Sequence, residues 1–414
     1  MTGQAVVPRR VDVLVVGAGP AGLAAAARLA AAGAGRVEVL EREAQPGGVP
    51  RHCAHGGFGT WTRPLTGPRY ARLLTEAAER AGATLRTGVT ALDWAPTGPV
   101  LTTVGPGGPE TVEARAVVLA TGARERPRAA RLVPGTRPAG VCTTGELQQA
   151  VHLFGQHIGT RAVVAGAADV SYAAAATVRT AGAEVVALVT EHPRAQAGRA
   201  RAGAARLGHG IPLLTDTTIT ELVGHGRLSG VRVRHRDGRT AVLPCDTVVF
   251  TGDFVPEHEL ARRGGLTLDP GTRGPAVGAT PHTSRPGVFA AGNLLHAVEP
   301  AGTAVREGAR AAGAVLDFLA GTPWPEPGVP VVVEPPLRWI APNRVTPGAV
   351  PARHVLRTGV PLPRPVLYVH QDGRLLHRQR LTAGTALPER TLTLAARWHD
   401  RVDPDGGPVR VSTG

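Results

Sequence analysis

The stretch VDVLVVGAGPAGLAAAARLAAAG, residues 11–33, decides the fold of this chain. Its first six residues are mostly apolar and rich in valine, which predicts a buried parallel strand. Gly17, Gly19 and Gly22 then follow with the spacing G-x-G-x-x-G, and an alanine-rich helical pattern comes next. With a second apolar run at residues 37–40, the stretch predicts a strand–helix–strand unit that opens a parallel sheet.

The residue types in this turn suit a bound dinucleotide. Gly17 permits the tight turn, Gly19 lets a pyrophosphate approach the backbone, and Gly22 lets helix and strand pack closely. Phosphate charge is stabilised by the free N–H groups at the start of the helix. Nineteen residues after Gly22 comes a carboxylate that can accept hydrogen bonds from ribose hydroxyls. We therefore predict dinucleotide binding at Gly17, Gly19, Pro20, Ala21, Gly22 and Glu41.

Three further segments point to FAD as the dinucleotide. EREAQPGG (41–48) places Arg42 after the acid and ends on Gly48, a second point of close backbone approach. VVLATGARERP (117–127) and TSRPGVFAAGN (283–293) each end a strand in a glycine step, and a helix is expected around residues 300–320. The three segments add six residues to the predicted cofactor contacts, Arg42, Gly48, Thr121, Gly122, Gly292 and Asn293.

This set of motifs resembles the flavoproteins with two dinucleotide-binding domains in the pyridine nucleotide–disulfide oxidoreductase superfamily. The resemblance covers residues 11 to about 320 and implies FAD as the cofactor. It also implies that Asn293 takes the place of the usual Asp, which bonds the ribityl chain of the flavin. An Asn side chain still offers hydrogen bonds there, but it carries no charge.

A closer resemblance rests on GGVPRHCAHGGFG (47–59), GVCTTGELQQAV (140–151), TGDFVPEHELARRGGLTLDPGTRGPAV (251–277) and AAGNLLHAVEP (290–300). Together these segments resemble the FAD-binding α-type subunits of hydrogen cyanide synthase, opine dehydrogenase and dye-linked proline dehydrogenase. The resemblance implies a partner flavoprotein subunit that oxidises an amino acid or amine, while this chain takes part in electron transfer. Because no cysteine follows Cys245, an iron–sulfur cluster would need a separate small chain.

A second strand–helix–strand unit at residues 161–189 repeats the first in degenerate form. Ala168 replaces the glycine that allows close approach, and Ser171 occupies the position where helix and strand pack. Asp169 puts negative charge near the expected pyrophosphate, and Thr190 stands where an acid would bind ribose. These departures favour a structural domain that has lost or altered its cofactor, and NAD(P) binding is the less favoured alternative.

The three cysteines argue against a dithiol disulfide reductase. No C-x-x-C occurs, and Cys142 has no partner nearby in the sequence. The alternative is that Cys53 and Cys142 lie close together in the folded protein.

The odd number of cysteines favours a reducing compartment, and the N-terminus has no apolar signal core, so we expect a cytoplasmic protein. Residues 11–35 contain charged residues and a turn, so they do not predict a membrane span.

The segment VPRHCAHGGFG (49–59) brings His52, Cys53 and His55 together. Three ligands so crowded, with none nearby to complete the set, argue against a metal site. A reactive thiol, a structural turn and a flavin-pocket role remain, and in the last the imidazoles would relay a proton. We take His52, Cys53 and His55, together with His296, as the candidate catalytic residues. The alternative for His296 is an ordinary loop residue.

Composition and organisation complete the prediction. All 46 basic residues are arginine and the formal charge is +14, but aromatic residues make up only 3%, which argues against nucleic-acid binding. We predict an α/β fold with two Rossmann-like three-layer dinucleotide-binding domains, one nested in the other, plus a small C-terminal β module. The expected segments are residues 1–138 and 253–322 for FAD, 139–252 for the degenerate domain, and 323–414 for a proline-rich linker and the module.

The function expected from the sequence is an FAD-dependent oxidoreductase, the α-type electron-transferring subunit of an amino-acid or amine dehydrogenase complex. One alternative is a stand-alone flavoprotein reductase driven by NAD(P)H. The other alternative is a flavin-binding assembly subunit without turnover. The small-molecule substrate itself is not encoded in any motif.

Overall fold

The computed structural model describes residues 8–414, apart from residues 61, 97, 347, 349, 382 and 383. The chain forms two compact units. The first contains residues up to 51, residues 57–123 and residues 255–414, and the second contains residues 52–56 and 124–254. The chain passes between the units at β9 (Ala123–Glu125) and β18 (Phe254–Pro256). The domain boundaries expected from the sequence, at residues 138, 252 and 322, stay a prediction.

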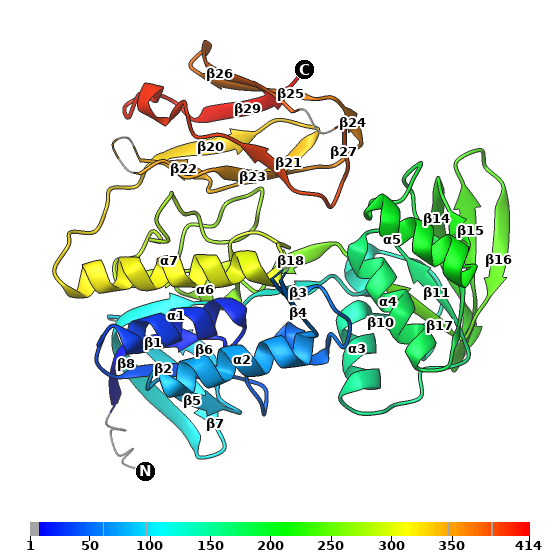
Figure 1. Ribbon diagram of the computed structural model, residues 1–414, viewed down its shortest axis with the longest axis horizontal. Coiled ribbons are helices and arrows are strands. Elements are labelled where there is room, and N and C mark those ends of the chain that lie inside the picture. Colours follow the sequence, from blue (N-terminus) through cyan, green and yellow to red (C-terminus); the bar gives the residue numbers. More distant parts are fainter. Residues whose placement is uncertain (1–7, 61, 97, 347, 349, 382–383) are drawn as a thin grey trace. The chain divides into compact units, whose positions relative to one another are not determined.

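The first unit is built on a seven-stranded sheet with the order β5-β2-β1-β8-β7-β6, in which β19 also pairs with β8 (Figure 1). The strands β5, β2, β1, β8 and β19 are parallel, whereas β6, β7 and the first half of β8 form an antiparallel meander. The strands are β1 (Arg9–Val16), β2 (Val37–Glu41), β5 (Thr84–Thr87), β6 (Thr90–Trp94), β7 (Val100–Gly105), β8 (Gly108–Leu119) and β19 (Val288–Ala290).

Alternation along β1 gives this sheet two apolar faces. Val13 and Val15 face a core shared with the long helices, whereas Leu14 and Val16 face a second core that includes residues of α6. The helices α1, α2 and α7 run beside one another in Figure 1. The helices and turns of this part are α1 (Pro20–Ala31), η1 (Val49–His52), α2 (Gly67–Arg80), α6 (Glu259–Arg263), η4 (Gly292–Leu294) and α7 (Ala301–Leu319), and the hairpin is β3 (Phe58–Thr60) with β4 (Arg63–Leu65).

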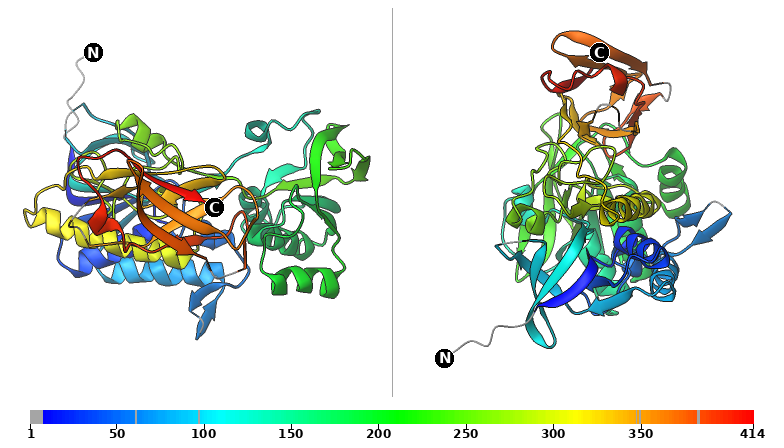
Figure 2. Two further views of the ribbon diagram at one scale, coloured as in Figure 1. Left: turned by 90° about the horizontal axis from the view of Figure 1, so that it is seen from above. Right: turned by 90° about the vertical axis from the view of Figure 1, so that its left-hand side faces the viewer.

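The C-terminal strands form a module of their own within the first unit (Figure 2). The module has a separate apolar core that includes Trp398. One sheet has the order β22-β20-β29-β25-β26 and the other has the order β21-β23-β28. The hairpin expected around Asp372-Gly373 is confirmed, since β25 pairs with β26 in antiparallel fashion. The strands are β20 (Val329–Val333), β21 (Leu337–Ala341), β22 (Arg344–Val345), β23 (His354–Thr358), β24 (Leu362–Pro363), β25 (Val366–Gln371), β26 (Arg374–Arg380), β27 (Thr385–Ala386), β28 (Leu392–Leu394) and β29 (Val409–Thr413), with η5 (His399–Arg401).

The second unit has a five-stranded parallel sheet with the order β10-β17-β11-β12-β13 and a three-stranded antiparallel sheet, β14-β15-β16. A separate core lies under each face of the parallel sheet. Its elements are η2 (Arg128–Arg131), β10 (Val141–Thr143), α3 (Thr144–His152), β11 (Arg161–Ala165), α4 (Asp169–Thr180), β12 (Glu184–Val189), α5 (Arg199–Gly203), η3 (Ala204–Gly208), β13 (Leu213–Leu214), β14 (Thr217–His225), β15 (Arg227–His235), β16 (Thr240–Pro244) and β17 (Thr247–Phe250).

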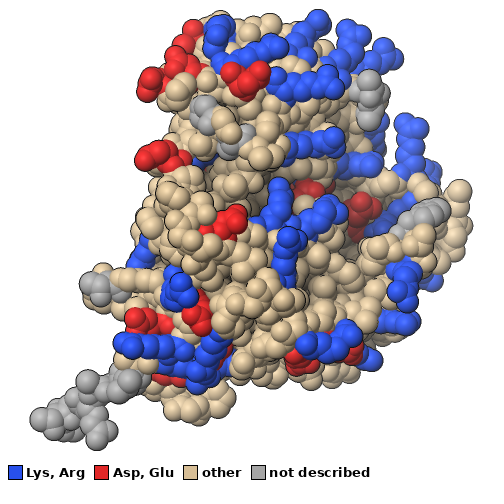
Figure 3. All heavy atoms as spheres, turned by 60° about the vertical axis from the view of Figure 1, so that its left-hand side comes forward, with Lys and Arg blue, Asp and Glu red and all other residues tan. Residues whose placement is uncertain are grey.

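Among the described residues, no helix is long and apolar enough to cross a bilayer. On the face drawn in Figure 3, arginine side chains gather over the C-terminal module at the top, where acidic side chains are fewer. The outer edge strand β26 contributes three exposed arginines to this module, Arg374, Arg378 and Arg380.

Candidate functional site

In the glycine turn between β1 and α1, Gly17 and Gly22 pack closely against the backbone, whereas Gly19 is open. Gly17 has φ +104°, and a Cβ there would lie 2.5 Å from the carbonyl oxygen of Ala120. A Cβ on Gly22 would overlap the carbonyl oxygen of Gly17. A Cβ on Gly19, in contrast, would meet no atom of the described residues within 4 Å. The missing side chain of Gly19 therefore leaves space at the surface of the turn.

The N-terminus of α1 is not capped by protein. Its N-cap is Gly19, no side chain caps it, and its first turn holds no acidic residue. The N–H groups at the start of a helix carry partial positive charge, which favours an anion. The open space at Gly19 and these N–H groups together fit the pyrophosphate of a dinucleotide.

Glu41 is anchored to the same turn. One carboxylate oxygen of Glu41 accepts a hydrogen bond from the N–H of Ala18 at 2.9 Å, and the other accepts from the N–H of Glu43 at 3.0 Å. The side chain is buried at the end of β2. A carboxylate oxygen can accept more than one hydrogen bond, so Glu41 keeps the capacity to accept a ribose hydroxyl. Arg42 points to the exterior, where its guanidinium lies 3.8 Å from the carboxylate of Glu43.

Two other chain segments reach this turn. Gly47 donates its N–H to the carbonyl of Ala18 at 2.8 Å, and a Cβ on Gly48 would lie 2.8 Å from the Cα of Gly19. On another side, a Cβ on Gly292 would lie 2.7 Å from the Cβ of Ala21. The segments after β2 and after β19 therefore converge on the first turn of α1.

Thr121 and Asn293 use their side chains within the protein. The Thr121 hydroxyl donates to the carbonyl of Glu257 at 2.7 Å, and Gly122 beside it has φ +77°. The amide of Asn293 closes its own loop: its oxygen accepts from the N–H of Glu299 at 3.1 Å, and its nitrogen donates to the carbonyl of Glu299 at 3.3 Å. The resemblance implies a bond from Asn293 to the flavin, and for that role its oxygen keeps a second lone pair and its nitrogen a second N–H.

His296 lies in the same loop and is almost fully buried. Its Nε2 lies 2.9 Å from one carboxylate oxygen of Glu307 on α7, and the other oxygen of Glu307 accepts from the N–H of Gly292 at 3.1 Å. The imidazole stacks on the indole of Trp339, with ring centroids 5.8 Å apart. The carboxylate therefore fixes both His296 and the backbone at Gly292.

The corresponding turn in the second unit is closed by its own side chains. Ser171 Oγ accepts the N–H of Ala168 at 3.1 Å and lies 2.6 Å from the hydroxyl of Thr251, which donates to the carbonyl of Ala165 at 2.7 Å. The first turn of α4 also carries the acidic residue Asp169. The N–H that would meet a phosphate at Ala168 is thus occupied, and the turn is less suited to an anion than the turn at Gly19.

The segment with two histidines and a cysteine begins in η1 and continues into the second unit. Cys53 is buried, and its thiol donates to the amide oxygen of Gln148 at 3.4 Å. Burial, followed by the negative charge of Glu125, raises the pKa of Cys53 to about 12. The alternative of a reactive thiolate is therefore not supported, because a thiolate nucleophile needs a lowered pKa.

The described residues contain no disulfide between the cysteines and no cluster of side chains that could hold a metal ion. All three cysteines are described, and each is free. Burial raises the pKa of Cys142 to about 12 as well. His52 is buried, and His55 Nδ1 lies 2.7 Å from the carbonyl of Gly56. Among the described residues, no group of three His, Cys, Asp or Glu side chains is placed to hold a metal ion.

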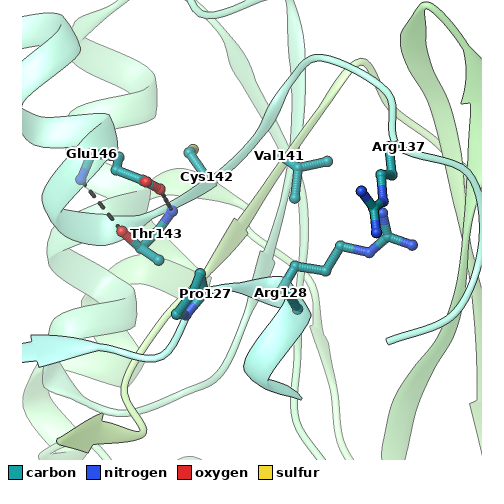
Figure 4. A pocket seen from close by; sticks show the side chains of 8 residues that line it. Pro127, Arg128, Arg137, Val141, Cys142, Thr143 and Glu146 are labelled. Carbon is teal, nitrogen blue, oxygen red and sulfur yellow. Dashed lines mark hydrogen bonds between the residues drawn. The ribbon is translucent and has the colours of Figure 1, made fainter. Parts of the chain in front are cut away.

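A cavity of about 410 Å³ lies in the second unit (Figure 4). Figure 4 shows Arg128 and Arg137 on one side of it and Glu146 on the other. The Arg128 guanidinium is held by the carbonyls of Val133, Gly135 and Thr136 at 2.5–3.0 Å. The walls between are mostly apolar, formed by Pro127, Ala129, Val141 and Cys142. The Glu146 carboxylate accepts the N–H of Thr143 at 2.7 Å in the N-terminal cap of α3, so both it and the Arg128 guanidinium are already paired within the protein.

Sequence analysis missed the residues that the C-terminal module brings to the first unit's site. Arg357, Trp339 and Thr391 all contact the loop that follows Asn293. They lie 40 to about 100 residues away in the sequence, in a part of the chain where no motif marked them. Glu307 was missed for a different reason, because a glutamate in a helical segment is usually exposed, whereas Glu307 is buried on α7.

Comparison with known proteins places these features in a family. The family model for pyridine nucleotide-disulphide oxidoreductase matches residues 11–308. The thioredoxin reductase of Mycolicibacterium smegmatis is 33% identical over 306 residues, which cover 72% of this chain and 94% of that protein. One of the opine oxidase subunits of Rhizobium meliloti is 29% identical over 311 residues, which cover 68% of this chain and 58% of that protein.

A solved structure supports the fold in the same region. The crystal structure of T. acidophilum thioredoxin reductase matches with a TM-score of 0.62 at 24% identity, covering 76% of this chain and all of that one. The likeness confirms the expected α/β fold with parallel sheets and two Rossmann-like domains. The family model ends before the C-terminal module begins at β20.

Proposed function

Because this chain belongs to the pyridine nucleotide-disulphide oxidoreductase family, we propose that it is the α-type electron-transferring subunit of an amino-acid or amine dehydrogenase complex. The family is one of FAD- and NAD(P)-binding oxidoreductases, which confirms the oxidoreductase class and the FAD expected from the motifs. The observation that carries the proposal is the contrast between two nucleotide turns. The turn at Gly19 is open and uncapped, whereas the turn at Ala168 is capped by Ser171.

The state of the cysteines supports a role other than disulfide reduction. A dithiol reductase passes electrons through two thiols close enough to form a disulfide, and one of them reacts as a thiolate. The pKa values of Cys53 and Cys142 are both raised to about 12, and both thiols are free. We infer that electrons enter and leave the flavin without a dithiol in this chain.

FAD supplies two-electron redox chemistry when it is bound, and the protein supplies binding and electrostatics. The N–H groups at the start of α1 would hold the pyrophosphate, and Glu41 would hold the ribose. Gly48 and Gly292 keep the neighbouring segments close to the turn. We assign His52, His55 and His296 to proton transfer near the flavin, and we assign Cys53 no covalent step.

The substrate class and partners are part of the proposal. The substrate class, an amino acid or amine, follows from the resemblance of the sequence motifs. The similarity to the Rhizobium meliloti relative supports a partner chain, since that relative is named as one subunit of an opine oxidase. With no cysteine beyond Cys245, an iron–sulfur cluster would belong to a separate chain, and three free cysteines suit a reducing, cytoplasmic location. The basic surface over the C-terminal module suits an acidic partner.

Reconstitution tests the proposal directly. The chain is expressed together with a candidate amine-oxidase-like flavoprotein partner, the two are purified as a complex, and reduction of a dye by a panel of amino acids is measured. Turnover by the complex, with none by this chain alone, is the expected result. Efficient NAD(P)H oxidation by this chain alone would establish a stand-alone reductase instead. A stable complex that holds FAD, with this chain's flavin never reduced, would establish a non-catalytic assembly role.

A further inference from the structure

The loop that follows Gly292-Asn293 is tied to the C-terminal module by a buried ion pair. Arg357 on β23 places its guanidinium 2.7 Å from a carboxylate oxygen of Glu299, and both side chains are less than 10% exposed. The same guanidinium donates to the carbonyl of Val298 at 2.7 Å. The hydroxyl of Thr391, next to β28, donates to the Glu299 carboxylate at 2.8 Å. The module therefore satisfies the carboxylate from two places in its fold.

Glu299 in turn is bonded to the residue that ends the glycine step. Its backbone N–H and carbonyl make two hydrogen bonds with the Asn293 amide. Gly292, one residue earlier, abuts Ala21 in the first turn of α1. A continuous series of contacts thus runs from Arg357 through Glu299 and Asn293 to the turn that would hold the pyrophosphate.

A second series of contacts starts from Trp339 on β21. The Arg357 guanidinium lies 5.2 Å from the centroid of the Trp339 ring, and the His296 imidazole stacks on the same ring. His296 then reaches the N–H of Gly292 through Glu307. Both series therefore begin on one face of the module and end at the Gly292-Asn293 step.

We propose that the C-terminal β module is a positioning part of the FAD site, in which Arg357 holds the loop 293–299 through Glu299. The proposal rests on FAD binding at the turn around Gly19 and is independent of the partner and substrate. Arg357 and Glu299 are positioning residues, because they act on the flavin through the loop and through their charge.

The chemistry of the pair argues for a specific role and not for bulk stability. Taking two charges out of water is costly, and well-packed apolar residues often stabilise a fold as well as a buried ion pair does. Here Arg357 Nη1 and His296 Nδ1 are moreover buried without a hydrogen-bond partner among the described residues. The contacts of the pair point to a role in holding the loop beside the cofactor turn.

The test uses Arg357→Met, Glu299→Gln and the double variant in the full chain. Arg338→Met is the control, because Arg338 lies in the same module and pairs 3.8 Å from Glu389 at the surface. For each protein the FAD dissociation constant and the midpoint potential of the bound flavin are measured, and near-UV circular dichroism checks the fold.

We expect each single variant to bind FAD at least tenfold more weakly and the control to bind as the wild type does. The midpoint potential of the bound flavin distinguishes an effect of the charges of Arg357 and Glu299 from a mere loosening of the loop 293–299. Arg357→Met leaves an uncompensated negative charge, which disfavours the charge gained on reduction and lowers the potential. Glu299→Gln leaves a positive charge and raises it, and the double variant returns towards the wild-type potential. A tenfold change in the affinity ratio of reduced to oxidised FAD corresponds to about 30 mV for a two-electron couple.

Two results would overturn the proposal. The first is unchanged FAD affinity and potential in folded single variants. The second is a shift of both single variants in the same direction, which would show only that the loop has loosened. If Arg357→Met does not fold, the FAD affinity and potential of Glu299→Gln alone test the proposal. This variant is expected to fold, because Gln still accepts a hydrogen bond from Thr391. A wild-type protein that binds no FAD would instead refute the FAD site itself.

Discussion

The hydroxyl of Ser171 lies 2.6 Å from the hydroxyl of Thr251, and this contact closes the nucleotide turn of the second unit. Thr251 donates its proton to the carbonyl of Ala165, so Ser171 donates to Thr251 and accepts from the N–H of Ala168. Both hydroxyls are therefore satisfied within the protein. A pyrophosphate at this turn would have to displace bonds that already exist and would meet the charge of Asp169.

We therefore expect little or no reduction of the flavin by NADH or NADPH. The purified protein is mixed anaerobically with low micromolar concentrations of each nucleotide, and the loss of flavin absorbance is followed. Dithionite serves as the control that the flavin can be reduced. Rapid bleaching by either nucleotide would contradict this expectation and would support the NAD(P)H-driven reductase.

Gly19→Val tests the cofactor turn of the first unit. The valine Cβ would meet no atom within 4 Å in the part of the chain that the structure describes, so the fold should persist, but the side chain would occupy the space left for the pyrophosphate. We expect FAD affinity to fall by about tenfold or more, which corresponds to at least about 1.4 kcal/mol of binding free energy. Affinity is measured by titrating the apoprotein and following flavin fluorescence.

Gly313→Val is the matched control for this variant, because Gly313 on α7 also has open space at its Cβ. Both variants should unfold at similar urea concentrations, and only Gly19→Val should lose FAD. Retention of wild-type affinity by Gly19→Val would move the cofactor away from this turn.

The parts of the fold that follow from local sequence were predictable. The strand at residues 9–16, the turn at Gly17 and the helix at residues 20–31 are fixed by valine runs, by glycine geometry and by alanine content. The hairpin at Asp372-Gly373 is confirmed for the same reason, since Asp372 and Gly373 both have positive φ. The degenerate turn at Ala168 was likewise visible in the residue types alone.

The rest depends on contacts between residues far apart in the chain. Arg357 and Trp339 carry no local signal, and only the folded module brings them to Glu299 and His296. The glycine step before Asn293 gave no sign that the Asn293 amide closes a loop. The pKa of the Cys53 thiol depends on burial and on a carboxylate 72 residues away in the sequence. Motif spacing cannot report such effects, because they arise from packing.

The cysteine thiols should resist alkylation in the folded protein. The pKa of Cys53 is raised by burial to about 12, so its thiolate fraction at pH 8 is about a thousandfold below that of a cysteine with a pKa near 9. Labelling with iodoacetamide, read by peptide mass spectrometry, should be slow in the native state and fast in urea. Fast native labelling of Cys53 would show a reactive thiolate and would bring back a catalytic role.

The C-terminal module should lose stability in mild acid. His354 Nδ1 lies 2.8 Å from the carbonyl of Pro342, so Nδ1 donates, and His354 Nε2 accepts from His399 Nε2 at 2.7 Å. Burial lowers the pKa of His354 to about 4. Since the unfolded state has a pKa near 6.5, it binds more protons between pH 6.5 and 4, and stability falls as pH falls through this window.

The expected loss from pH 7 to pH 4 is about 3 kcal/mol in the free energy of unfolding, and the loss levels off below pH 4. Urea unfolding at a series of pH values measures it. His354→Gln removes the titrating group and should flatten this part of the profile, whereas His370→Gln, on β25 in the same module, should leave it steep. A steep profile in His354→Gln would assign the effect to other groups.

The last prediction concerns His52 and His55, which we expect to relay protons at the flavin. Their position, four to seven residues past Gly48, is the basis of the expectation. The contact from His55 Nδ1 to the Gly56 carbonyl makes Nδ1 the donor, so Nε2 of the neutral ring is a proton acceptor. His52→Ala and His55→Ala should keep FAD but slow flavin reduction by roughly 10²- to 10⁴-fold, the usual contribution of a general acid or base. Rates are measured across pH by stopped-flow in the reconstituted complex.

Cys53→Ser is the control. Its flavin should be reduced at close to the wild-type rate, because the Cys53 thiol forms no covalent bond in the proposed reaction. If both histidine variants match the wild type at every pH, the two side chains serve the turn and not the chemistry.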